Sequence, residues 1–305
     1  MNTGPERDVR PEAVSATPGP LDRRTDPLSG VECVVVPARQ GRPNLPDAGC
    51  PFCPGGLEAP DGPYSARCIP NRWPAMPDRR CEVVLYTDQH DLAFWQLGHG
   101  GALEVVELWA RRTRELSRRG DVGYVLIFEN RGPEVGATIA HPHGQIYAYP
   151  EIPPVPLAEI VDGVLEIPAV DHPNSVSTRG DWSAWIPEAP VWPYELLLAP
   201  AGAQRSLDDP GTDLDGLADL LVDVLARLDQ FAQGAMPYML WIHQLPADDR
   251  VSGGPPVHVH IAPYLRAPGT ARYVAAAELG AGIYFDPVDP ASAAGDLRSM
   301  AGSTP

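Results

Sequence analysis

The sequence predicts an α+β fold in which one unit of strands and a helix occurs twice. Each half shows the order strand, helix, strand, turn and strand, and each ends in a His-x-His pair, His141/His143 and His258/His260, 117 residues apart. Because side chains alternate faces along a strand, both histidines of a pair are expected on one side of the sheet. Two unrelated hairpins that both carry histidines are the alternative.

The composition is that of a globular protein, not of a fibre, a disordered chain or a disulfide-stapled miniature. Of 305 residues 44% are hydrophobic and 21% are charged, which suits about two domains at ~100–200 residues each. The chain has no lysine, and its 23 arginines face 40 acidic residues, for a net charge of −17. Because nucleic acids and anionic membranes are bound mainly by basic surfaces, we expect neither as a partner.

The ends of the chain and its cysteines indicate a soluble, cytoplasmic protein. Residues 1–24 are polar, contain proline and lack periodicity, which predicts a disordered tail. The sequence has no apolar signal core and no run of the ~18–20 residues that a membrane helix needs. The five cysteines are odd in number, and the pair Cys50-x-x-Cys53 is typical of metal or redox chemistry in a reducing compartment.

The first unit is expected in the N-terminal half. The β-rich run 31–36 and the segment 81–86 predict strands. Residues 103–117 carry apolar side chains at roughly helical spacing with arginines on the other side, which predicts a helix. Two apolar strands, 122–128 and 144–149, follow on either side of a Gly-Pro turn.

The second unit repeats this order in the C-terminal half. A strand is expected at 196–198 and the clearest amphipathic helix of the chain at 214–231. A strand over 238–242, a Gly/Pro turn at 253–256 and a strand over 257–264 complete it.

The segment Ala140-His-Pro-His-Gly-Gln145 carries the strongest chemical signal. It places two imidazoles beside a glycine, which allows close backbone approach, and beside an amide that can orient an anionic oxygen. One imidazole can bind a metal while His143 stays available as a nucleophile. A structural role for His143 is the alternative.

This segment, together with Phe128-Glu-Asn-Arg-Gly132, resembles the active-site region of the galactose-1-phosphate uridylyltransferase family, which belongs to the histidine-triad group. The resemblance extends from Asp26 to about Arg298. It implies a duplicated histidine-triad-like half-barrel, with antiparallel sheets and packed helices. Residues 25–165 would form the catalytic half with the zinc site, and residues 166–305 the half with the second histidine pair. Further matching segments are Arg39-Gln-Gly-Arg-Pro43, Cys50-Pro-Phe-Cys53, Trp192-Pro-Tyr-Glu195 and Pro263-Tyr-Leu-Arg266.

The resemblance implies a double displacement in galactose metabolism. His143 would attack the α-phosphorus of UDP-glucose and release glucose 1-phosphate, and galactose 1-phosphate would then take the uridylyl group. Gln145 would hydrogen-bond the phosphoryl oxygens. Other sugar 1-phosphates or nucleotides, a phosphorylase or hydrolase that also uses His143, and a zinc-knuckle binding module are the alternatives.

Two metal sites are expected. Cys50 and Cys53 in a Pro/Gly-rich turn, with His90 and His141, can complete the Cys₂His₂ set of a structural zinc, and the family site occupies the same positions. A redox or incidental C-x-x-C is the alternative. The resemblance also implies a second site for iron or zinc, with a metal-free histidine cluster as its alternative. Its ligands would be Glu159, His243, His258 and His260.

Substrate contacts follow from the resemblance. Arg39 and Arg42 match family arginines that reach phosphate across a dimer interface, so a homodimer is expected. A solvated arginine pair is the alternative. Thr138 stands where better-known members have serine. The other expected contacts to the nucleotide and its phosphates are Asn71, Arg72, Asn130, Gly136 and Ala137.

The sugar end departs from the family pattern. The segment that contacts the hexose in the family corresponds here to Arg272, Tyr273, Ala277, Glu278 and Tyr284. Arg272 stands where many members have lysine, Ala277 where tyrosine is common, and Tyr284 near a usual glutamine. Hydroxyl and amide groups that are missing here can no longer hydrogen-bond the sugar, and this changes which sugar the site prefers. Galactose is therefore the substrate that the family suggests, and the residues at this end do not specify it.

Overall fold

The computed structural model of the chain describes residues 20–41, 49–246, 251 and 253–300. Most of the expected tail, residues 1–19, and Arg42 lie outside them. The end of that tail is corrected, because Asp22–Thr25 forms strand β1, paired antiparallel with β2 (Glu32–Val35). The side chain of Arg23 bonds Glu151 at 2.7 Å as well as Glu32, and it ties this hairpin to the main body.

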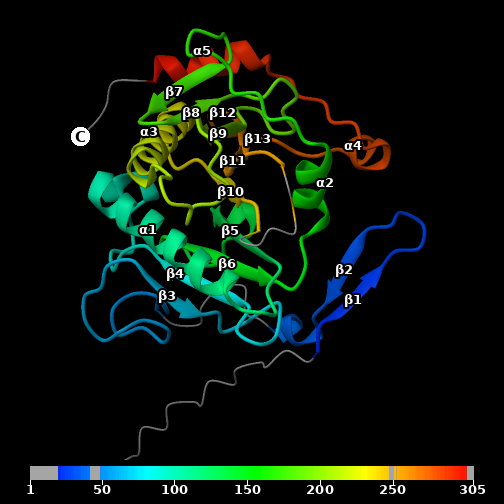
Figure 1. Cartoon of the computed structure of the whole chain (residues 1–305). Helices are drawn as coiled ribbons and strands as arrows, with labels where there is room; N and C mark the ends of the chain where they lie inside the picture. Colours follow the sequence, from blue (N-terminus) through cyan, green and yellow to red (C-terminus); the bar gives the residue numbers. More distant parts are fainter. Residues whose placement is uncertain (1–19, 42–48, 247–250, 252, 301–305) are drawn as a thin grey trace, which may run out of the picture.

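A nine-stranded antiparallel sheet spans both halves of the chain (Figure 1). The strand order β3-β4-β6-β5-β10-β11-β9-β8-β7 places the last strands of the two expected units, β6 and β11, on either side of the central pair β5 and β10. The predicted α+β class is therefore confirmed. The strands are β3 (Arg67–Pro70), β4 (Cys81–Leu85), β5 (Tyr124–Arg131), β6 (His143–Tyr149), β7 (Ser175–Arg179), β8 (Trp182–Trp185), β9 (Leu196–Pro200), β10 (Tyr238–His243) and β11 (His258–Pro263), with a small hairpin of β12 (Leu265–Ala267) and β13 (Thr270–Ala271).

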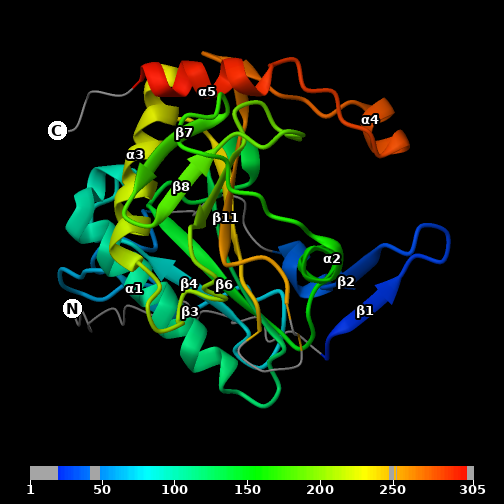
Figure 2. The same cartoon turned by 45° about the horizontal axis from the view of Figure 1, so that its top comes forward.

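The two long helices pack together on one face of this sheet, and α2 lies on the other side (Figure 2). Helix α3 begins after Asp213, whose carboxylate accepts from the Gly216 amide and so caps the first turn. Helix α1 begins earlier than its apolar pattern predicts, at Gly98, despite the low helix propensity of glycine. The helices are α1 (Gly98–Ser117), α2 (Pro154–Asp162), α3 (Leu214–Ala232), α4 (Ala276–Ala281) and α5 (Pro290–Ser299), with the short turns η1 (Pro37–Gly41), η2 (Phe94–Leu97) and η3 (Pro133–Val135).

Strand alternation gives the sheet two chemically different faces. The helix-covered face is apolar, and Ile127, Ile146 and Leu240 are buried in its core. The opposite face carries His143 of β6 and the pair His258 and His260 of β11, whereas His141 precedes β6. No helix among the described residues is long and apolar enough to cross a membrane.

Candidate active site and metal centres

His143 is the first residue of β6, with β4 and β5 as the neighbouring strands. It lies opposite Leu85 in register, and Gln145, two residues on, lies opposite Phe128. Because Gly144 between them faces the helices, His143 and Gln145 share the other face and are both half-buried. The expected juxtaposition of imidazole and amide is therefore present.

The hydrogen bond to one ring nitrogen fixes the tautomer of His143. Its Nδ1 lies 2.8 Å from the carbonyl oxygen of His141, which can only accept, so Nδ1 carries the proton. The lone pair of the neutral ring is then on Nε2. The ring of Phe52 packs against the imidazole edge to face, at 5.0 Å between ring centroids. This is the arrangement of a nitrogen nucleophile.

The amide of Gln145 is oriented by Asn71. Asn71 Nδ2 donates to Gln145 Oε1 at 3.2 Å, and Asn71 Oδ1 accepts from the Trp73 amide at 2.8 Å. Because the Gln145 oxygen takes the bond from Asn71, its NH₂ group is left to donate to another acceptor. Asn71, which was expected at the nucleotide, thus contacts the amide that is expected to bind the phosphoryl group.

The first expected metal set is assembled. The candidate ligand atoms of Cys50, Cys53, His90 and His141 all lie within 4.8 Å of one another. Cys53 Sγ is 3.5 Å from His90 Nδ1 and 3.6 Å from His141 Nδ1. Tetrahedral zinc with Zn–S of about 2.3 Å and Zn–N of about 2.0–2.1 Å requires an S–N separation near these values. The residues present fit zinc.

Further contacts hold these ligands in place, and no sequence motif predicted them. His141 is fully buried, and its Nε2 donates to the Thr87 carbonyl at 2.7 Å, which turns Nδ1 toward Cys53. Burial lowers the pKa of His141, which favours the neutral ring that a metal ligand needs. The Tyr64 hydroxyl lies 3.1 Å from the same Nε2 and donates to the Phe52 carbonyl. These contacts join the cysteine turn to the strand that carries His143.

The cysteine turn itself depends on Gly56. Its amide donates to the Cys53 carbonyl at 2.7 Å, and a Cβ added at Gly56 would lie 2.6 Å from the carbonyl oxygens of Cys50 and Pro51. The Phe52 amide lies 3.4 Å from Cys50 Sγ. The Pro/Gly context therefore positions both thiols as expected.

The second expected set is also assembled, between α2 and strands β10 and β11. Glu159 Oε2 lies 2.6 Å from His243 Nδ1 and 3.4 Å from His258 Nε2, and Glu159 Oε1 lies 3.9 Å from His260 Nε2. His258 Nδ1 donates to the Pro256 carbonyl at 2.8 Å, so Nε2 is the ring nitrogen that faces the carboxylate.

The electrostatics of this cluster suit a metal. Burial works to raise the pKa of Glu159, but the hydrogen bonds from His243 and His258 hold it well below its ordinary value. Burial lowers the pKa of His260 to about 3, and the two neighbouring imidazoles act in the same direction. His260 Nε2 is buried with no hydrogen-bond partner among the described residues. Three imidazoles and a carboxylate fit iron or zinc.

The expected phosphate contacts are placed unevenly. Arg72 is half-buried, and its Nε is covered yet has no acceptor in the described part of the chain. Asn130 Nδ2 donates to the Val135 carbonyl at 2.9 Å and braces the turn before Gly136, whose φ of 86° is left-handed. Arg39 lies in η1, at the base of the β1–β2 hairpin.

The hexose segment differs most from expectation. Arg272 and Glu278 are buried and bonded to each other, and the carboxylate of Glu278 also accepts from the amides of Ala275 at 2.6 Å and Phe285 at 2.9 Å. Glu278 thus holds α4 together rather than presenting open acceptors to a sugar. Tyr273 is exposed, and α4 stands away from β6 in both views (Figures 1 and 2).

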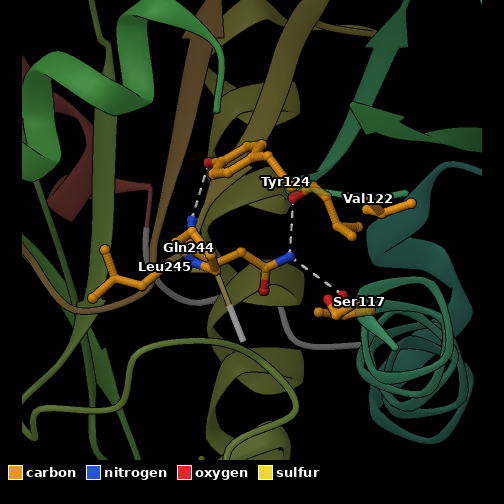
Figure 3. Close-up of a pocket in the computed structure, with 9 residues that line it drawn as sticks. Ser117, Val122, Tyr124, Gln244 and Leu245 are labelled. Carbon is orange, nitrogen blue, oxygen red and sulfur yellow. Dashed lines mark hydrogen bonds between the residues drawn. The ribbon is translucent and has the colours of Figure 1, made fainter. Parts of the chain in front are cut away.

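Two cavities contrast in size. The smaller, of about 20 Å³, lies where the first half meets the second: Gln244 Nε2 donates to Thr113 Oγ1 at 3.3 Å, and its backbone amide donates to the Tyr124 hydroxyl (Figure 3). It holds about one water and no nucleotide. The larger is an open depression of about 590 Å³ that includes Tyr284 and Asp286.

Comparison with known proteins identifies relatives of this chain. A family model described as galactose-1-phosphate uridyl transferase, N-terminal domain, matches residues 70–153. The galactose-1-phosphate uridylyltransferase of Thermotoga maritima is 31% identical over 318 residues, covering 91% of this chain and 98% of the relative. A solved structure of a uridylyltransferase superposes with a TM-score of 0.82 at 29% identity, covering 92% and 98% of the two chains.

A relative with another activity shares the fold. An ADP-glucose phosphorylase of Arabidopsis thaliana is 24% identical over 335 residues, covering 91% of this chain and 92% of its own. Its crystal structure superposes with a TM-score of 0.70, covering 90% of this chain and 98% of that one. Fold and site define a protein of the histidine-triad type. The chain belongs to the galactose-1-phosphate uridylyltransferase family.

Proposed function

We propose that this protein is a nucleotidyltransferase that moves UMP from UDP-glucose to galactose 1-phosphate through a covalent uridylyl-histidine at His143. The observation that carries this is the hydrogen bond from His143 Nδ1 to the His141 carbonyl, which places the ring lone pair on Nε2, on the strand face that also carries Gln145. Family membership supports the same reaction class.

Both half-reactions are displacements at the same phosphorus: the imidazole of His143 enters in the first and leaves in the second. His143 Nε2 forms a bond to the α-phosphorus of UDP-glucose as the bond from that phosphorus to the bridging oxygen breaks, and glucose 1-phosphate leaves. A phosphate oxygen of galactose 1-phosphate then attacks the same phosphorus, and the P–N bond breaks to give UDP-galactose. The proton stays on Nδ1 throughout, hydrogen-bonded to the His141 carbonyl oxygen. The Gln145 NH₂ donates to the phosphoryl oxygens as charge develops.

Metals have a structural role in this proposal. Zinc at Cys50, Cys53, His90 and His141 would cross-link the cysteine turn to the segment before β6, and metal binding of this kind contributes folding free energy. Iron or zinc at Glu159, His243, His258 and His260 would join α2 to β10 and β11.

The duplication and the homodimer are part of the proposal. The symmetry of the strand order about β5 and β10 supports two repeated units, 25–165 and 166–305. The β1–β2 hairpin exposes Val31, and α2 and the region of α4 expose Val161 and Phe285. Apolar side chains of this size favour an interface with a second copy. Arg39 on that side would then reach the partner's phosphate site.

A nucleotide-sugar phosphorylase is the second candidate function, and the arrangement of the hexose segment supports it. Because Glu278 and Arg272 bond each other, the sugar contacts that define the galactose reaction are reduced. With inorganic phosphate as acceptor, His143 would pass on the nucleotidyl group in the same way. The Arabidopsis relative supports this option.

Labelling without an acceptor tests both candidates. The protein is incubated in turn with UDP-glucose, GDP-mannose and ADP-glucose that carry a labelled α-phosphate. Acid-labile, alkali-stable label on the protein identifies the nucleotide and the phosphoramidate together. Labelled protein is then chased with galactose 1-phosphate, other sugar 1-phosphates or inorganic phosphate. We expect label from UDP-glucose and release by galactose 1-phosphate; absence of label from all three donors contradicts the proposed function.

A further inference from the structure

A carboxylic acid lies in the apolar core behind the active-site strand. Glu129 of β5 is on the helix-covered face and is only 4% exposed. Its Oε2 accepts from the Tyr86 hydroxyl at 2.9 Å and its Oε1 from the Tyr238 hydroxyl at 2.7 Å. Burial raises the pKa of Glu129 to about 7, and the two tyrosines and Arg131 act against that rise. The reaction proposed above makes no use of this group.

Tyr86 connects the carboxyl group to the reacting strand. Its hydroxyl lies against Gly144, so that a Cβ added there would overlap the hydroxyl oxygen and lie 3.1 Å from the ring carbon that bears it. The Tyr86 amide also donates to the Pro142 carbonyl at 3.3 Å. Tyr86 therefore contacts the chain immediately before His143 and immediately after it.

Neighbouring aromatic rings leave Tyr86 little freedom. It packs against Phe94 at 5.4 Å and Trp109 at 6.0 Å between ring centroids, both edge to face. On the far side of Glu129, Tyr238 lies under the guanidinium of Arg131, at 5.7 Å from its ring centroid. Arg131 in turn bonds Asp229 of α3 at 2.6 Å. The network thus runs from α3 through the central strands to β6.

We propose that Glu129 and Tyr86 are positioning residues for the nucleophile: the carboxyl group holds the Tyr86 hydroxyl beneath Gly144, and this sets the backbone that aims His143 and Gln145. Neither touches the substrate, since both lie on the opposite face of the sheet. This role rests on the proposed function of His143. Small displacements of reacting groups are costly in rate, which is why a contact behind the strand matters.

Two tyrosine variants form a matched pair. Tyr86→Phe and Tyr238→Phe each remove one hydroxyl donor from the same buried carboxyl group, so both should lower the melting temperature by similar amounts. Only Tyr86 contacts the His143 strand. We expect Tyr86→Phe to slow label formation at saturating UDP-glucose by about 10-fold, and Tyr238→Phe by much less. Equal rate effects in the two variants would overturn the positioning role.

Gly144→Ala supplies a rescue experiment. The added methyl group meets the Tyr86 hydroxyl, so this variant should label slowly. The double variant Gly144→Ala/Tyr86→Phe removes the overlapping oxygen and should label faster than Gly144→Ala alone. If the two substitutions acted independently, their losses would add and the double variant would label more slowly than Gly144→Ala. A double variant that is slower than either single variant would overturn the proposal.

A substrate-free readout separates this inference from the proposed function. In protein with ¹⁵N-labelled histidine, the His143 Nδ1–H signal is assigned by its loss in His143→Asn. It should shift in Tyr86→Phe and stay in place in Tyr238→Phe. If the wild type takes no label from any donor, the reaction is wrong, and this signal still decides the positioning role: no shift in Tyr86→Phe refutes it.

Discussion

The two His-x-His pairs occupy corresponding strands on either side of the sheet centre, yet their surroundings differ. On β6, His143 is followed by Gly144 and the outward-facing Gln145, and its own Nδ1 is held by a carbonyl. On β11, His260 is followed by Ile261 and Ala262, stacks on Trp241 at 4.8 Å and faces Glu159.

This difference indicates how one scaffold supports two roles. The second strand has no amide at the position of Gln145, and its imidazoles are drawn onto a carboxylate. At the first strand, His141 faces a thiol, and His143 combines a defined tautomer with the oriented amide donor of Gln145 on the same strand face. We infer that the reaction belongs to β6, and that the pair on β11 binds a metal.

The largest effect is expected for the nucleophile. His143→Asn should reduce label formation by about 10⁴-fold or more, because it removes the imidazole that is proposed to take the nucleotidyl group. It should still fold and keep its zinc, since His143 is not among the ligand candidates. Quantified label per protein checks this, with His260→Asn as the matched variant on β11. If His143→Asn transferred the nucleotidyl group at a near-wild-type rate, or if only His260→Asn lost transfer, the reaction could not be assigned to β6.

Gln145 should follow. Gln145→Ala removes one oriented donor to developing charge, which typically costs about 10²–10³ in rate. Because the same phosphoryl group is bound in both half-reactions, rapid-quench measurements should find both slowed by similar factors. Asn71→Ala, which leaves the amide in place without its anchor, should have a smaller effect in the same direction. A change only in discrimination between sugar 1-phosphates would place Gln145 at the wrong end of the substrate.

The zinc set should affect stability more than chemistry. Cys50→Ser should lower zinc content and melting temperature together, because metal binding contributes to folding free energy. Cys68→Ser is the control, since the Cys68 thiol bonds Glu82 at 2.9 Å and is not among the ligand candidates. Metal analysis and thermal unfolding of both variants decide the point. A wild type without zinc, or with a melting temperature insensitive to chelators, would refute the site.

The smallest effect is expected for the pH dependence of stability that Glu278 contributes in the C-terminal half. The side chain of Arg272 lowers the pKa of Glu278 from 4.5 to about 2. A carboxyl group with a depressed folded-state pKa stabilises the fold above pH 4.5, and that contribution is lost as pH falls toward 2. Between pH 6 and pH 3, the free energy of unfolding should therefore decline less steeply with falling pH in Glu278→Gln than in the wild type. If the two proteins lost stability with pH at the same rate and Glu278→Gln changed sugar selectivity instead, Glu278 would belong to the hexose site.

Much of the fold followed from periodicity. The strands expected at 81–86, 144–149, 238–242 and 257–264 and the helix at 214–231 are all confirmed within a few residues. The strand β7 was not expected, because its sequence Ser-Val-Ser-Thr-Arg has one apolar residue and its pairing partner β8 supplies the burial. The cytoplasmic location and the homodimer stay predictions.

What the sequence determined by itself was chemistry carried by neighbours along the chain. His143 and Gln145, like His258 and His260, are two residues apart on a strand and must share a face, and Cys-x-x-Cys in a tight turn brings two thiols together, whatever surrounds them. Only the tertiary structure decided which distant groups meet these: the Thr87 carbonyl at His141, Asn71 at Gln145, and Tyr86 behind Gly144. It also turned Glu278 inward onto Arg272. Such contacts depend on strand register and packing between residues far apart in the chain, and local spacing carries no information about either.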